Sequence, residues 1–74
     1  MNYLQAINYG NKLLKLNNLK SYNLDSELLL SKVLNYSREK ILINLNDKIE
    51  KKKFTKFKRL IFRRKNNEPI AYIL

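Results

Sequence analysis

The sequence predicts an all-α fold in which four to five helices form a small bundle. Apolar residues recur at helical spacing, no stretch alternates as a strand would, and the 74 residues include only one Gly and one Pro. A chain of this length makes one domain with a thin hydrophobic core. Helices are expected at residues 2–17, 24–35, 37–45 and 48–65, with a short one at 69–74.

The first predicted helix has one apolar face. At about 100° per residue, one arc collects Tyr3, Ala6, Ile7, Gly10, Leu13 and Leu14. Gly10 lies in the middle of this arc, although Gly costs a helix about 1 kcal/mol relative to Ala. We expect Gly10 either to admit a closely packed helix or to be a tolerated replacement. Asn17, Asn18 and residues 20–23 then form a turn or loop.

The second predicted helix is apolar on nearly all sides, which places it at the centre of the bundle. Asn23 is its expected N-cap, and Asp25 and Glu27 lie near the positive end of the helix dipole. Its apolar residues are Leu28, Leu29, Leu30, Val33 and Leu34.

The third and fourth helices are each expected to begin at a capping residue. Ser37 caps the third helix. That helix carries three side chains toward the core, namely Ile41, Leu42 and Leu45. Asp47, with Glu50 three residues later, matches a capping box in which Asp replaces Ser or Thr.

The fourth predicted helix separates an apolar arc from a basic arc. The apolar arc holds Ile49, Phe54, Phe57, Leu60 and Ile61. The basic arc holds Lys48, Lys52, Lys56, Arg59 and Arg63. The two Phe rings therefore face the core and do not interleave with the cations as base-stacking rings would. Arg64 projects within the apolar arc, so we expect it to snorkel or to pair with Glu68 or Asp25.

The last twelve residues, RRKNNEPIAYIL, are typical of a helix end followed by a junction. Asn66 and Asn67 are expected to end the fourth helix, since Asn tolerates the left-handed conformation. Pro69 fits the first turn of a fifth helix or an extended linker, and Tyr72 is expected to pack its ring on the bundle with its hydroxyl in water. Domains rarely end in an apolar run, so we expect the chain to stop at a domain boundary.

The formal charge of +10 is concentrated in residues 48–65, which carry ten basic and one acidic side chain. Such a segment suits RNA, an anionic membrane or an acidic protein partner. The alternative is a solvated face on an AT-rich coding background, which twelve Lys, eleven Asn and seven Ile also indicate. A membrane-surface helix is the weakest of these hypotheses, because the small core needs its apolar arc.

The composition of the chain argues against disulfides and metal sites. There is no Cys and no His, which removes disulfides, thiolate metal sites and the commonest metal ligand. No apolar run approaches the roughly 18 residues of a membrane span, and the start lacks the pattern of a secretory signal. We expect a cytoplasmic monomer with no catalytic, cofactor-binding or metal-binding residue.

Two segments together resemble a known family. NEPIAYIL, preceded by RR, resembles the signature that ends the N-terminal domain of the HemK/PrmC family, the protein-(glutamine-N5) methyltransferases that act on peptide chain release factors. Upstream, NLDSELLLSKVLN resembles that family's LDAELLLAHVLG helix. The two segments have the order and spacing of the family, and the resemblance covers essentially the whole chain.

The resemblance implies that residues 1–74 are a helical N-terminal domain, followed by a linker and a Rossmann-like domain that this chain lacks. The second domain binds S-adenosylmethionine and holds the target glutamine with an Asn-Pro-Pro-Tyr motif. This chain alone is therefore expected to be inert, while the parent it resembles is an enzyme. In the family the N-terminal domain helps to dock a class-1 release factor, which orients the glutamine of its catalytic loop.

The family motif carries over onto Asp25, Glu27, Leu28, Leu29, Arg63, Arg64, Glu68, Pro69, Ala71 and Tyr72. Most of these are expected to hold the domain together or to set its linker. The chain departs from the family at Asn67, where Gly is usual, at Asn23, where a basic residue is common, and at Ser26, where Ala is usual.

The candidate partner-binding residues are Lys52, Lys56, Arg59, Arg63 and Tyr72. The leading hypothesis is that they dock a release factor. The alternative is a freestanding basic helical module that binds RNA or the ribosome, although the basic face lacks the rings that nucleic-acid binding favours.

Overall fold

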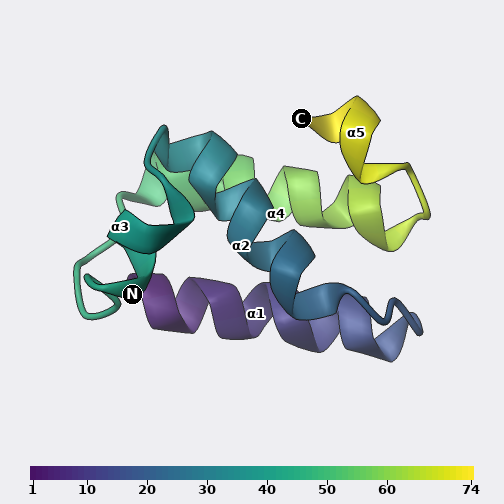
Figure 1. Cartoon of the computed structure of the whole chain (residues 1–74), viewed down its shortest axis with the longest axis horizontal. Coiled ribbons are helices and arrows are strands. Elements are labelled where there is room, and N and C mark those ends of the chain that lie inside the picture. Colours follow the sequence, from purple (N-terminus) through teal and green to yellow (C-terminus); the bar gives the residue numbers. More distant parts are fainter.

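The computed structural model describes residues 1–74 and confirms the all-α bundle. Its five helices are α1 (Tyr3–Leu16), α2 (Tyr22–Leu34), α3 (Arg38–Leu42), α4 (Lys51–Lys65) and α5 (Ile70–Ile73). Helices α1, α2 and α4 pack against one another, α3 packs on α2, and α5 packs at the end of α4 (Figure 1). None of the five has the length and apolar character that crossing a membrane requires.

The beginning of α1 holds the connection between α3 and α4. Asn2 and Gln5 form a capping box, in which each side chain accepts a hydrogen bond from the other's backbone N–H. The next backbone groups pair with the connection, since Tyr3 N–H donates to the Asp47 carbonyl and Ile49 N–H donates to the Met1 carbonyl, both at 3.0 Å. The N-terminus therefore lies beside α3 (Figure 1).

Two of the expected helix starts are wrong. Helix α2 begins at Tyr22, and Asn23 lies inside its first turn. The Asn23 amide accepts from Asn11 Nδ2 at 2.9 Å and donates to Glu27 Oε2 at 3.1 Å, so it is used in side-chain contacts. Helix α4 begins at Lys51 without a side-chain cap.

The expected capping box at the start of α4 therefore does not form. Glu50 occupies the cap position of α4 and makes no side-chain cap bond. The backbone of Asp47 serves the N-terminus of α1 instead. The Asp47 N–H, which the box would pair with the Glu50 side chain, donates instead to the Asn44 carbonyl at 2.9 Å.

Helix α3 is shorter than expected and ends at Leu42. The Ser37 cap is confirmed, because its hydroxyl accepts from Lys40 N–H at 3.1 Å. Ile41 is buried as expected, and Leu45 packs partly against the core. Leu42 is 42% exposed, so its expected inward position is wrong.

At the other end of the molecule, the break after α4 forms as expected. Asn67 has a φ of 68°, which confirms the left-handed turn predicted there, and Pro69 precedes the short α5. The expected packing of Tyr72 on the bundle is wrong, since this residue is 77% exposed. The side chain that anchors α5 is the buried Ile73.

The hydrophobic core lies among α1, α2 and α4. Its buried members are Tyr3, Ala6, Ile7, Leu14, Leu29, Leu30, Ile41, Ile49, Phe57, Ile61 and Ile73. The core arc predicted for α4 is confirmed in that Phe57 and Ile61 are fully buried, while Phe54 packs edge-on against the Tyr9 ring at 5.4 Å.

Gly10 of α1 lies directly against side chains of both α2 and α4. A Cβ at this position would lie 2.7 Å from Ser26 Oγ on α2 and 2.8 Å from Ile61 Cδ1 on α4. Both distances are shorter than a carbon can occupy without moving its neighbours. Gly10 therefore permits the close helix approach, as the first of the two alternatives predicted.

We expect Gly10→Val to destabilise the fold by about 2 kcal/mol, because overpacking a close-packed core typically costs 1–3 kcal/mol. Urea unfolding followed by circular dichroism measures the change. Asn8→Val, at an exposed position of the same helix, is the matched control and should change stability by less than about 0.5 kcal/mol. Equal effects of the two substitutions would show that Gly10 is not a contact point.

Candidate interaction surface

An ion pair joins the beginning of α2 to the end of α4. Arg64 Nε donates to Asp25 Oδ2 at 2.8 Å, and the two side chains are only 17% and 5% exposed. The Ser21 hydroxyl donates to the same carboxylate oxygen at 2.8 Å. This confirms that Arg64 pairs with an acidic residue, and it gives a buried carboxylate the partners that burial demands.

A second ion pair attaches α3 to α2. Arg38 donates through Nε at 3.1 Å and through Nη2 at 2.7 Å to Glu27 Oε1. Glu27 is buried and also accepts from Asn23 Nδ2. Both acidic residues of the family motif in α2 are therefore engaged in holding helices together.

A third ion pair closes the turn that leads to α5. Arg63 Nε donates to Glu68 Oε2 at 2.9 Å, and Arg63 Nη2 pairs with Glu68 Oε1. Arg64 Nη1 donates to the Glu68 carbonyl at 3.1 Å. The side-chain hydrogen bonds between Arg63 and Glu68 raise the pKa of the Arg63 guanidinium and lower the pKa of the Glu68 carboxyl. Both arginines and Glu68 thus fix the turn.

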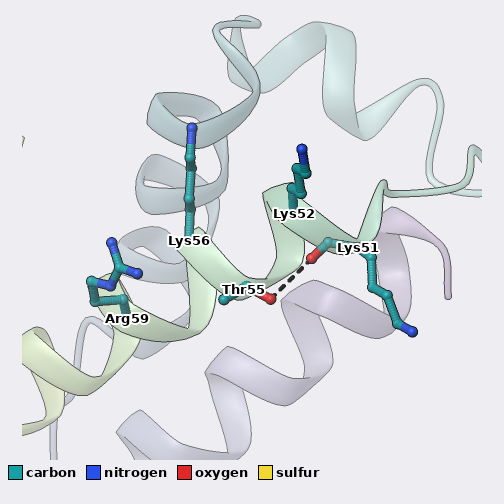
Figure 2. Close-up of a pocket in the computed structure, with 5 residues that line it drawn as sticks. All are labelled: Lys51, Lys52, Thr55, Lys56 and Arg59. Atoms are coloured by element: carbon teal, nitrogen blue, oxygen red, sulfur yellow. Dashed lines mark hydrogen bonds between the residues drawn. The ribbon is translucent and has the colours of Figure 1, made fainter.

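Three other cations of α4 face solvent on one side of the helix. Figure 2 shows Lys52, Lys56 and Arg59 extending to the same side of α4, whereas Lys51 extends to the other. None of these four side chains makes an ion pair, a hydrogen bond or a cation–π contact within the chain. Lys53, by contrast, donates to the Val33 carbonyl at 3.4 Å and so serves the C-terminus of α2.

Two adjoining hollows lie along this side. One, of about 290 Å³, is lined by residues of both α2 and α4, namely Lys32, Val33, Lys56, Arg59 and Leu60. The other, of about 340 Å³, is lined by residues of α4 alone, namely Lys51, Lys52, Thr55, Lys56 and Arg59. The two share Lys56 and Arg59, so they form one continuous surface.

The structure brings together only part of the expected binding set. Lys52, Lys56 and Arg59 share the surface, but Arg63 is engaged by Glu68 and lines neither hollow. Tyr72 is exposed on α5 and lines neither hollow. Sequence reasoning missed Lys32 and Val33, because their place beside α4 depends on how two helices pack.

Neither a metal-binding cluster nor a Gly-rich cofactor loop is found among the described residues. No three acidic side chains gather where they could hold a metal ion. Gly10, the one Gly, is packed inside α1 and cannot form the Gly-rich loop of a cofactor site. These residues therefore do not fit S-adenosylmethionine.

Comparison with known proteins places the chain in a family. The model of the PrmC N-terminal domain matches residues 5–74, and the chain belongs to this family. It is 39% identical over 70 residues to the release factor glutamine methyltransferase of Buchnera aphidicola subsp. Schizaphis graminum, covering 92% of the chain and 26% of that protein. No solved structure matches the chain.

Two further relatives are similar over most of the chain. The release factor glutamine methyltransferase of Clostridium botulinum is 43% identical over 65 residues, which cover 88% of the chain and 23% of that protein. The bifunctional methyltransferase of Rickettsia conorii is 39% identical over 55 residues, or 74% of the chain and 10% of that protein. The chain thus spans about a quarter or less of the length of these relatives.

We expect Arg64→Met to destabilise the fold by about 3 kcal/mol, because it leaves the buried Asp25 carboxylate without its cation. Arg59→Met is the matched control on the same helix, and since Arg59 has no partner it should change stability by less than about 0.5 kcal/mol. Urea unfolding measures both variants. If both substitutions lower the free energy of unfolding by the same small amount, the ion pair does not hold α2 to α4.

Glu68 should titrate below its ordinary pKa of 4.5. A carboxyl whose pKa is lower in the folded state stabilises that state above its unfolded pKa, and the contribution is lost as the pH falls through the folded pKa. Carbon-13 NMR of the carboxyl measures the midpoint. In Arg63→Met the midpoint should rise toward 4.5, and in Arg59→Met it should not change; an unshifted midpoint in Arg63→Met would contradict the pairing.

Proposed function

We propose that the chain is the release-factor docking domain of a release factor glutamine methyltransferase. The single observation that carries this proposal is the match of the PrmC N-terminal domain family over residues 5–74. The names of two relatives, release factor glutamine methyltransferase, support the choice of a class-1 peptide chain release factor as the protein partner.

In this proposal the chain does not carry the chemistry. Transfer of a methyl group from S-adenosylmethionine to the glutamine of the release factor's catalytic loop belongs to a Rossmann-like domain in cis. Residues 69–74 lead toward that domain. The described residues contain no cofactor loop and no metal-ligating cluster, which supports a non-catalytic role for the chain itself. The proposed compartment is the cytoplasm, and the proposed state of the domain is a monomer.

The contribution of the domain to catalysis is positioning. A protein substrate held at a second surface presents its reacting group with less loss of translational and rotational freedom at the active site. The unpaired Lys52, Lys56 and Arg59 support an electrostatic attraction toward an acidic region of the partner. Exposed ion pairs contribute only about 0–1 kcal/mol each, so binding by the chain alone should be weak and should dissociate rapidly.

The test is a titration of the nitrogen-15-labelled chain with an unlabelled class-1 release factor, followed by two-dimensional NMR. We expect shifts at a contiguous set of surface residues, with an affinity in the micromolar to millimolar range. An unrelated acidic protein of similar size and charge is the control and should cause smaller, scattered shifts. Undisturbed resonances at millimolar release factor would contradict the proposed docking role.

A further inference from the structure

The surface between α2 and α4 combines unpaired cations with an aliphatic floor. We name this surface the α2–α4 groove and define it by Lys32, Val33, Lys56, Arg59 and Leu60, which line a hollow of about 290 Å³. Val33 and Leu60 are half-buried and pack partly against the core. The three cations stand around them on two different helices.

The cations of the groove have no partner within the chain. Lys32, Lys56 and Arg59 make no ion pair, hydrogen bond or cation–π contact. No acidic residue lines the groove or the hollow that adjoins it. Three like charges around one hollow create a local positive potential, which an anionic partner would neutralise. The charge of the groove therefore favours a partner that presents carboxylates or phosphates.

The floor of the groove distinguishes between these two anions. No aromatic ring lines either hollow, and Phe54 of α4 is turned toward Tyr9 of α1 instead. Single-stranded RNA gains much of its affinity from stacking on such rings. An aliphatic floor suits an apolar side chain of a protein segment, and Arg59 can pair with a carboxylate through two parallel hydrogen bonds.

We propose that the α2–α4 groove binds an acidic protein segment, in which one aliphatic side chain enters between Val33 and Leu60 while neighbouring carboxylates pair with Lys32, Lys56 and Arg59. Lys52, on the same side of α4, extends the cationic surface beyond the hollow (Figure 2). The inference rests on the proposed function in so far as this segment belongs to the release factor. Arg63 is not among the proposed binding residues, because its guanidinium is engaged by Glu68.

The first test uses a synthetic peptide in which one Leu is flanked by Glu residues. Titrated into the nitrogen-15-labelled chain at up to millimolar concentration, it should shift resonances of residues 32–33 and 52–60. Replacing its Leu by Ser should weaken binding several-fold. Shifts that lie elsewhere on the chain, or equal binding of the two peptides, would overturn the proposed mode. Tighter binding of an oligouridine at the same residues would overturn the choice of a protein partner.

Paired charge reversals test whether the peptide binds the groove specifically or responds only to the net charge of the chain. Lys56→Glu with Arg59→Glu should weaken peptide binding by about tenfold or more, since two favourable pairs become repulsive. Lys12→Glu with Lys48→Glu makes the same change in net charge at exposed positions that line neither hollow, and should weaken binding by less than about twofold. Circular dichroism verifies that both double variants fold. If both double variants lose peptide affinity equally, the groove is not the binding site.

The same variants separate this inference from the proposed function. If the release factor binds the Lys56→Glu/Arg59→Glu variant as tightly as it binds the unmodified chain, the groove is not its docking site, although the docking role stands. If the peptide binds the groove but the release factor does not bind the chain at all, the groove stands as an acidic-segment site and the docking role fails.

Discussion

The ion pair between Asp25 and Arg64 is the contact on which the rest of the structure depends. It connects residues 39 positions apart and joins the beginning of α2 to the end of α4. At the opposite ends, Lys53 near the start of α4 donates to the Val33 carbonyl at the end of α2. The two helices therefore run antiparallel with a register fixed at both ends. That register places Lys56 and Arg59 beside Lys32, so the groove is a consequence of the pairing.

Six of the nine basic residues of α4 form two groups with different physical roles. Lys53, Arg63 and Arg64 are engaged by carbonyl or carboxylate groups of the chain and hold α2, α4 and the turn before α5. Lys52, Lys56 and Arg59 have no such partner and leave their charge on the surface. Total charge alone could not separate these groups, because both are basic and both lie on one helix. The separation comes from the positions of two acidic side chains, Asp25 and Glu68, and of the Val33 carbonyl.

Much of this structure could be predicted from the sequence, and most of the failures have a common cause. Helical spacing located the helices and the core arc of α4, because each depends on the geometry of a single helix. It also indicated that Arg64 would snorkel or meet an acidic group, but the choice of Asp25 over Glu68 depends on how α2 packs against α4. Asn23 failed as a cap because Asn11, on another helix, engages its amide. Asp47 does not cap α4 because the helix begins later, at Lys51, and the Asp47 N–H donates to the Asn44 carbonyl. Lys32 and Val33 were missed because a shared groove requires knowledge of how two helices pack.

The position of the groove along α4 bears on how docking would assist the proposed enzyme. Helix α4 is 15 residues long, or roughly 22 Å at 1.5 Å per residue, and the groove lies along its middle. Its far end is fixed by Arg63 and Arg64 to the turn that begins α5. A segment held in the groove would therefore have a defined distance from that turn. Weak pairing at exposed charges suffices for this purpose, because positioning a substrate that must also leave requires orientation more than affinity.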